Sequence, residues 1–190
     1  LDANVHNIAV DGTFDDCQTI VKGLFRDAPF RDSVQLSGVN SINFGRIVAQ
    51  IVYYFTAAVS LGAPHRPINF VVPTGNFGDI FAGYAAKQMG LPIANLVIAT
   101  NSNDILARTL HSGVYETDGV VPTISPSMDI QVSSNFERLL FEALGRDGSG
   151  VQRLMASLQQ SGRFSVPPSA LAAIRADFAA GRADEATTSA

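Results

Sequence analysis

The chain contains 190 residues, of which 46% are hydrophobic and 16% are charged, and its formal net charge is −4 at pH 7. This composition is typical of a soluble globular protein and excludes a disordered, collagen-like or coiled-coil chain. Because the net charge is negative and no basic run occurs, neither nucleic acid nor an anionic membrane is expected as a partner.

The first elements predicted along the chain are a strand and a helix. Val5–Val10 is short and rich in β-branched residues, which predicts a strand. Thr13 followed by Asp16 is a capping-box pattern for the start of a helix. Within that helix, apolar residues recur at helical spacing and predict a buried stripe formed by Cys17, Ile20, Val21 and Leu24.

A long apolar helix is predicted next. After a short extended piece at Val34–Leu36, Asn40 or Ser41 can cap a helix that runs to Leu61 and stops at Gly62. Its apolar run is interrupted by polar residues, among them Gln50, and is shorter than the roughly 20 residues that a bilayer crossing needs. The run therefore predicts a buried helix.

Strands and helices then alternate. Ile68–Val72 predicts a strand covered on both faces, and Leu96–Ala99 predicts a second buried strand. A helix from Asp79 to about Met89 lies between them, and another helix, capped within Asn101–Asp104 and closed by Gly113, follows. This β-α-β-α order predicts an α/β fold, with a parallel sheet flanked by helices.

The order becomes less regular after Gly113. Val114–Val132 contains prolines and no sustained periodicity, which predicts a loop with short strands. A second capping box at Ser134 and Glu137 predicts a helix that ends near Gly145. Two more helices are predicted, at Val151–Gln160 and at Ala170–Ala180, and Ser169 is the expected cap of the second. Beyond Gly181 a frayed end is predicted.

Few side chains suggest a metal site or a disulfide. Cys17 is the only cysteine, which excludes an intrachain disulfide and fits a reducing compartment such as the cytoplasm. His6, His65 and His111 lack the spacing of metal ligands, so no metal is expected.

The turn Pro73-Thr74-Gly75-Asn76-Phe77-Gly78 is the most informative feature of the sequence. Its two glycines permit positive φ, so that backbone N–H groups can converge on one point, and the N-terminus of the following helix adds further N–H donors. Asn76 can add a side-chain donor. The turn is neither a Walker A loop nor a dinucleotide fingerprint. Two readings stay open: a site for a single phosphate group, or glycines that merely allow a tight strand-to-helix turn.

Five segments resemble the threonine synthases of the bacterial and fungal type. They occur in the order of that family, cover nearly the whole chain, and are Asn7–Gln18, Asn40–Ile47, Pro73–Ile80, Ala99–Leu106 and Ser125–Arg138. The resemblance implies the tryptophan-synthase-β-like fold (fold type II) of pyridoxal 5′-phosphate (PLP) enzymes. It further implies that Gly75, Asn76, Phe77 and Gly78 hold the cofactor phosphate; Thr74 stands where many relatives have serine.

The resemblance also implies a reaction and a missing residue. The reaction is the conversion of O-phospho-L-homoserine and water to L-threonine and phosphate, in which a lysine carries the cofactor. The lysines of this chain are Lys22 and Lys87, and neither stands in the family's lysine motif. We expect both to be solvated helix residues, and we expect no catalytic residue here. Residues 1–190 are thus predicted to be the central part of the cofactor-binding catalytic region, inactive alone, with residues 114–190 as an irregular and then helical section.

Other polar clusters are weaker candidates. Ser41, Asn43 and Arg46, together with Asn40, could position cofactor or phosphorylated substrate, or could simply cap and solvate a helix start. Asp15 and Asp16 suggest an acid–base or metal pair, although carboxylates also favour the first turn of a helix. Ser125, Ser127 and Asp129 could line the cleft.

Two further functions compete with a threonine synthase. Another PLP lyase or dehydratase of the same fold is disfavoured by the segments around Asp11–Gln18 and Ser125–Ile130. A non-catalytic module that binds a phosphorylated small molecule is favoured by the lack of a usable lysine and disfavoured by the expected start of this sequence in the middle of a fold. In either enzyme reading, the rest of the polypeptide would be needed to complete the site.

Overall fold

The computed structural model describes residues 2–189, and these fall into two compact units that divide between Ser37 and Gly38. The first unit contains helix α1 (Phe14–Arg26) and helix α2 (Ala28–Ser33). The predicted capping box is confirmed, since Thr13 and Asp16 bond to each other's backbone N–H. The bonds that the N–H and the hydroxyl of Thr13 donate to the Asp16 carboxylate hold the pKa of Asp16 below its ordinary value.

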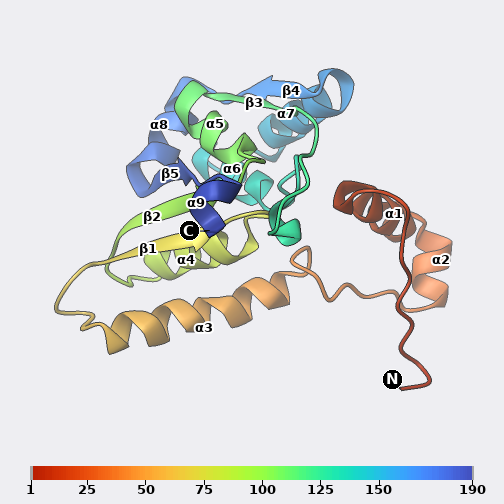
Figure 1. Ribbon diagram of the computed structural model, residues 1–190, viewed down its shortest axis with the longest axis horizontal. Coiled ribbons are helices and arrows are strands. Elements are labelled where there is room, and N and C mark those ends of the chain that lie inside the picture. The colour runs from red at the N-terminus through yellow and green to blue at the C-terminus, as the bar shows by residue number, and fades with distance from the viewer. Residues whose placement is uncertain (1, 190) are drawn as a thin grey trace. The chain divides into compact units, whose positions relative to one another are not determined.

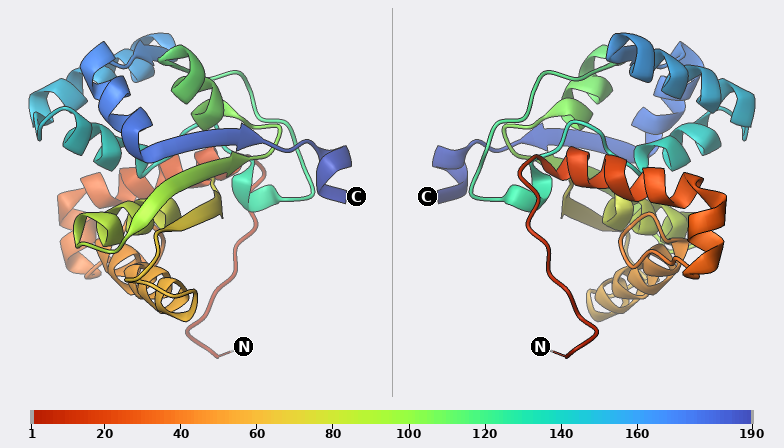
Figure 2. Two further views of the ribbon diagram at one scale, coloured as in Figure 1. Left: turned by 90° about the vertical axis from the view of Figure 1, so that its left-hand side faces the viewer. Right: turned by 90° about the vertical axis from the view of Figure 1, so that its right-hand side faces the viewer.

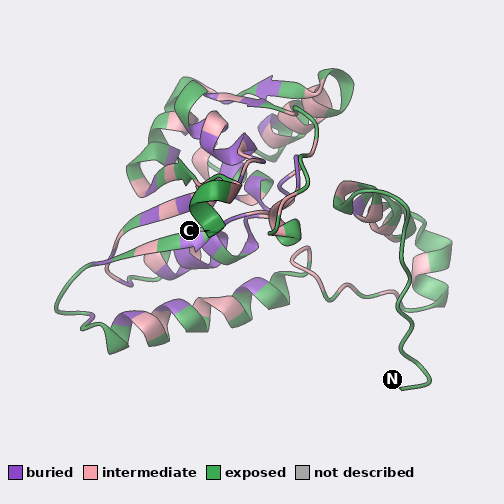
Figure 3. Ribbon diagram, in the orientation of Figure 1, coloured by how far each residue is buried: buried purple, intermediate pink, exposed green. Residues whose placement is uncertain are grey.

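Two predictions for the first unit are wrong. Val5–Val10 is exposed and forms no strand, because no neighbouring strand in the unit pairs with it. The stripe on α1 is not buried within the unit either: Ile20 is 52% and Leu24 is 40% exposed. Figure 3 shows that exposed residues predominate here, and Gln18 is the single buried residue in the described range 2–37.

The second unit is built on a parallel sheet, as predicted. Strands β1 (Ile68–Pro73), β2 (Ile93–Thr100) and β5 (Phe178–Arg182) pair in the order β1-β2-β5. β5 falls where the sequence predicts the end of a helix and a frayed terminus, and that prediction is wrong. Phe-Ala-Ala-Gly-Arg has little strand propensity of its own, but the free edge of β2 supplies its hydrogen bonds.

Helices lie on both sides of this sheet. Figures 1 and 2 show α3 (Phe44–Ser60) and α4 (Gly78–Gln88) on one side, with most of the later helices on the other. The remaining elements are α5 (Ile105–Ser112), β3 (Val114–Glu116), the 3-10 turn η1 (Pro126–Met128), α6 (Phe136–Ala143), α7 (Gly148–Ser161), β4 (Arg163–Ser165), α8 (Pro168–Asp177) and α9 (Glu185–Ser189). Within the described residues, no helix has the length and apolar character required to cross a membrane.

Helix caps differ from the prediction at three places. Asn43, rather than Asn40 or Ser41, caps α3 by accepting a bond from Gly45 N. α6 begins after Asn135, and no side-chain bond from its N-cap residue supports it, so Ser134 and Glu137 are not a capping box. α8 follows Pro167 rather than Ser169, because proline already has the backbone angle that a helix start requires.

The core of the second unit lies between the sheet and its helices. Ile80, Leu96, Ile98 and Leu140 are fully buried in it. β1, however, is not covered on both faces as its apolar run predicts, since Val71 is 68% exposed. β1 is the edge strand of the described sheet, and the helices on this side leave that residue open.

Helices α3 and α4 pack closely because a glycine lies at their contact. A Cβ atom on Gly83 would lie 2.6 Å from the Tyr54 ring. Tyr54 reaches the first turn of α4, where its hydroxyl donates to Asp79 O at 3.0 Å and to Asp79 Oδ1 at 3.1 Å. This contact fixes α3 against the residues that follow the glycine turn.

Tyr54 is expected to make stability depend on pH above about 10. Burial, and secondly the charge of Asp79, raise the pKa of the Tyr54 hydroxyl far above its ordinary value. As pH rises, the unfolded chain therefore loses the hydroxyl proton at a lower pH than the folded chain does. Stability falls as pH rises past the pKa that Tyr54 has in the unfolded chain. Urea unfolding at pH 9 and pH 11 should show a larger loss for wild type than for Tyr54→Phe; equal losses would contradict this assignment.

Candidate functional site

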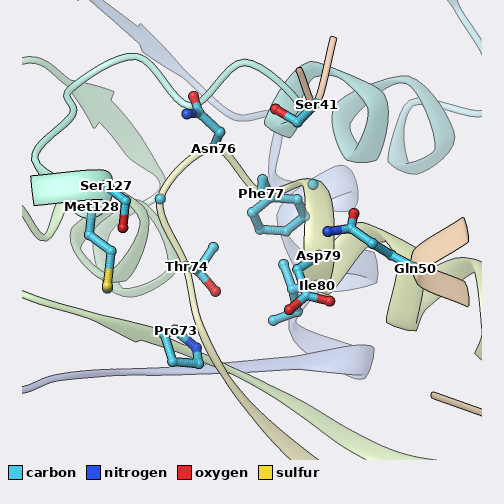
Figure 4. Close-up of a pocket in the computed structure, with 12 residues that line it drawn as sticks. Ser41, Gln50, Pro73, Thr74, Asn76, Phe77, Asp79, Ile80, Ser127 and Met128 are labelled. Carbon is cyan, nitrogen blue, oxygen red and sulfur yellow. The ribbon is translucent and has the colours of Figure 1, made fainter. Parts of the chain in front are cut away.

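The glycine turn, residues 73–78, lies at the carboxyl end of β1 and leads directly into α4. Ligands of open α/β sheets bind at this edge. Beside the turn lies a cavity of about 340 Å³, here called the turn pocket. Its lining residues, shown in Figure 4, are Ser41, Gln50, Pro73, Thr74, Gly75, Asn76, Phe77, Gly78, Asp79, Ile80, Ser127 and Met128.

The positive φ in this turn belongs to Phe77 and not to a glycine. Phe77 has φ 64° and ψ 2°, whereas Gly75 and Gly78 are not in the left-handed region. The predicted reason for the glycines is therefore wrong. A left-handed non-glycine residue costs about 1–3 kcal/mol. Burial of the Phe77 ring, whose centroid lies 5.5 Å from that of Phe136, offsets this strain.

Gly75 is required for space, and Gly78 lies in a tight contact. A Cβ atom on Gly75 would lie 2.8 Å from the backbone oxygen of Ser127, and one on Gly78 would lie 3.1 Å from Ser41 Cβ. The segment at Ser127–Met128 thus approaches the turn more closely than a side chain at Gly75 permits, while the loop before α3 would have to give by a few tenths of an ångström to admit one at Gly78. These approaches form two walls of the turn pocket.

The carbonyl groups of the turn are bonded away from the pocket. Ser133 Oγ donates to Gly75 O at 2.8 Å, while the N and Nδ2 atoms of Asn135 both donate to Asn76 O at 3.0 Å. The Asn76 side chain is directed to the same loop, where its Oδ1 accepts from Ser134 Oγ at 3.2 Å. Asn76 therefore contributes to the turn's shape.

The N-terminus of α4 supplies N–H donors. Phe77 is its N-cap residue and makes no side-chain capping bond in the described structure. Uncapped N–H groups at a helix start, together with the helix dipole, form a binding site for an anion such as phosphate. Thr74 takes no part through its hydroxyl, which donates to Val72 O at 2.6 Å and so holds the end of the strand.

A partly buried polar network holds the Ser127–Met128 wall in place. The carboxylate of Asp129 accepts bonds from Asn101 Nδ2 at 2.8 Å, from Asn103 Nδ2 at 3.0 Å, and from the N and Oγ1 of Thr123 at 2.8 and 2.7 Å. Asn101 and Asn103 lie just beyond the end of β2 and are buried. The network therefore fastens the irregular segment to the same sheet edge that carries the glycine turn.

The structure separates the candidate residues near α3. Ser41 lines the turn pocket. Asn43 is engaged in capping α3 and in donating to Gly38 O at 2.7 Å. Arg46 is exposed and donates to Val39 O at 3.1 Å. Of the other candidates, Ser127 lines the pocket, and Asp16 belongs to the capping box of α1.

Neither lysine lines the turn pocket. Lys87 is not solvated as predicted: its side chain is 22% exposed and pairs with Asp177 Oδ1 at 2.7 Å. The pair joins the end of α4 to the end of α8, immediately before β5. Lys22 lies in α1, in the first unit.

Gln50 is a pocket residue that the sequence analysis missed. It lies on α3, between Ile47 and Tyr54 at helical spacing, and lines the turn pocket. A signal was present in the sequence, since a lone glutamine interrupts the apolar run of that helix. Periodicity alone did not indicate that the glutamine lies on the face directed toward α4.

Comparisons with known proteins identify the group that the chain resembles. No protein-family model matches the chain. A threonine synthase of Pseudomonas aeruginosa is 58% identical over 163 residues, which are 86% of this chain and 35% of that protein. The threonine synthase of Saccharomyces cerevisiae is 48% identical over 200 residues, covering 99% of this chain and 39% of its own length.

Solved structures agree with the sequence comparison. The crystal structure of PLP-bound threonine synthase from Brucella melitensis matches with a TM-score of 0.89 and 63% identity, over 99% of this chain and 40% of that one. The crystal structure of the yeast threonine synthase matches with a TM-score of 0.81 and 45% identity. This match covers 96% of this chain and 38% of the yeast chain. The chain thus spans about 35–40% of the length of these relatives. Over nearly all of its residues, the chain is similar to part of a threonine synthase in sequence and in its tryptophan-synthase-β-like fold.

Proposed function

We propose that the chain is part of a threonine synthase and supplies the phosphate end of its pyridoxal 5′-phosphate site. The observation that carries this proposal is the glycine turn. Its carbonyl groups are bonded on one side, and the turn pocket lies beside its N–H groups and the uncapped start of α4. The similarity to threonine synthases, one of them described as PLP-bound, supports the choice of ligand.

The residues present fit a phosphate monoester. Gly75, Asn76, Phe77 and Gly78 would hold the phosphate through main-chain N–H groups, as neutral donors in a turn whose shape is fixed before binding. Ser41 would lie at the wall beside Gly78, and Ser127 with Met128 at the wall beside Gly75. The cofactor, when bound, would supply the electron sink that loss of the substrate's phosphate requires.

The proposed reaction converts O-phospho-L-homoserine and water to L-threonine and phosphate, in the cytoplasm. Residues 1–190 would then be a central part of the cofactor-binding catalytic region, and residues 114–190 would contribute Thr123 and Asp129 of the polar network and the helices behind them. The lysine that carries the cofactor would come from the rest of a longer polypeptide. Asn43 and Arg46 would act indirectly, by shaping the loop that places Ser41.

A chimera tests this proposal. In this chimera, the chain would replace the segment of the Brucella melitensis enzyme that it matches. The two are 63% identical over the matched residues. Phosphate and threonine formation from O-phospho-L-homoserine should keep a kcat/KM within about tenfold of the parent enzyme. The chain alone should release no phosphate. A chimera that folds and binds PLP, yet forms no threonine, would contradict the proposal.

One observation favours a second function, a non-catalytic module that binds a phosphorylated small molecule. Neither Lys22 nor Lys87 lines the turn pocket, so the chain by itself holds a phosphate site without a group that could carry PLP. The same chimera separates the two functions, since a binding module would bind phosphate esters without restoring threonine formation. A different PLP lyase or dehydratase is disfavoured, because the relatives named above are threonine synthases.

A further inference from the structure

Gln50 is the residue of the turn pocket whose presence packing does not explain. The stripe of α3 that faces the core contains Ile47, which is fully buried, and Tyr54, which is 4% exposed. Gln50 lies between them, three residues after one and four residues before the other, so it shares their face. An apolar side chain at this position would pack with less desolvation cost than an amide.

The side-chain oxygen of Gln50 has no hydrogen bond to offset that cost. Its Oε1 atom is inaccessible to solvent and has no partner among the described residues. A buried polar atom without a partner is rare in folded proteins and calls for an explanation, such as a role in binding a ligand, an ion or water. Figure 4 shows the amide directed toward Phe77 and Asp79, at the start of α4.

The position of this amide is fixed by the next turn of the helix. Tyr54, four residues on, donates to both the backbone and the carboxylate of Asp79, which holds this face of α3 against the first turn of α4. The Asp79 carboxylate, which lies beside the pocket, thus already accepts a hydrogen bond from the Tyr54 hydroxyl. Gln50 is thus held near the end of α4 that attracts an anion.

We propose that Gln50 is a binding residue of the turn pocket and that its amide donates a hydrogen bond to the phosphate ester held by Gly75–Gly78. This inference rests on the proposed function and adds a side-chain donor to the main-chain site. Figure 4 shows the amide nitrogen of Gln50 as the end nearer to Phe77, so the NH₂ group is the end that can meet a phosphate oxygen. A neutral donor suits this site, because binding then requires no change of protonation.

The test is a ³¹P NMR titration of the full 190-residue chain with pyridoxine 5′-phosphate, which lacks the aldehyde that reacts with lysines. Inorganic phosphate and pyridoxine are titrated in parallel, so that binding of the phosphate group is separated from binding of the ring. Gln50→Met retains the side chain's size and removes the amide, Gln50→Ala removes the amide without filling its place, and Gln159→Met is the control on the exposed face of α7.

Wild type and Gln159→Met should bind pyridoxine 5′-phosphate equally, while both Gln50 variants bind it about tenfold more weakly, as loss of a hydrogen bond to a charged group predicts. Without ligand, Gln50→Met should unfold at a higher temperature than wild type, because the orphaned oxygen is removed. Weaker ligand binding together with a higher unfolding temperature indicates a binding role for Gln50. If its role were structural alone, substitution would lower the stability of the protein.

Two other results are distinguishable. If Gly75→Ala weakens binding and both Gln50 variants bind as wild type does, the role of Gln50 is overturned and the phosphate site at the glycine turn stands. If wild type and Gly75→Ala bind equally, or neither binds, the phosphate site itself is overturned, and the role of Gln50 with it.

Discussion

Gly75→Ala is expected to weaken binding of pyridoxine 5′-phosphate by about tenfold or more, since one or two hydrogen bonds to a charged group are lost. The new methyl group would lie 2.8 Å from Ser127 O and 3.3 Å from Met128 Cα, and both contacts are with backbone. To relieve these clashes, the turn or the facing segment must shift. The shift moves the main-chain N–H groups away from the positions at which they would bond to the phosphate. We expect an accompanying loss of about 1–3 kcal/mol in the free energy of unfolding.

Gly23→Ala is the matched control for this substitution. A Cβ atom on Gly23, within α1, would meet nothing within 4 Å. Alanine there should leave phosphate binding unchanged and raise stability by about 0.5–1 kcal/mol. A Gly75→Ala variant that binds the ligand and unfolds as wild type does would show that the close approach of Ser127 does not shape the site.

Asp129→Ala is expected to destabilise the protein by about 3 kcal/mol, because it leaves several donors without their charged acceptor. Asn101 and Asn103 are buried and cannot turn to water, while Thr123 loses bonds from both its N–H and its hydroxyl. The segment 121–131 should lose protection in hydrogen exchange before the sheet does. Binding of pyridoxine 5′-phosphate should also weaken, since Ser127 and Met128 belong to this segment.

Urea unfolding followed by circular dichroism measures this loss. Asp32→Ala is the control, because Asp32 pairs with Arg31 at an exposed position and its removal should change stability by less than about 0.5 kcal/mol. If Asp129→Ala and Asp32→Ala unfold at the same urea concentration, Asp129 does not hold the wall of the turn pocket.

Local sequence patterns predicted the parts of this fold that depend on local interactions. The capping box at Thr13, the helix after the glycine turn and the first two parallel strands follow from spacing and turn residues, and the structure contains them. The strand β5 could not be predicted in this way. Its residues form a strand only because β2 offers a free edge about 80 residues earlier in the chain, which no local window contains.

The candidate site shows the same division. The sequence indicated Gly75–Gly78 as a turn between strand and helix, but assigned its positive φ to glycine, whereas Phe77 takes that conformation and is supported by burial of its ring. The real reason for Gly75 is the approach of Ser127, more than 50 residues later. Gln50 was hidden in the same manner, because only the packing of α3 on α4 brings it to the turn pocket.

The most direct test of the account is a map of backbone amide shifts by ¹H–¹⁵N NMR as pyridoxine 5′-phosphate is added to the chain. We predict that the largest shifts fall at Gly75 to Ile80, that inorganic phosphate reproduces them in part, and that pyridoxine does not. Shifts centred elsewhere would contradict the account, for example on the arginine-lined surface formed by Arg108, Arg163 and Arg182. So would unperturbed amides at Gly75–Gly78 when the ligand is bound.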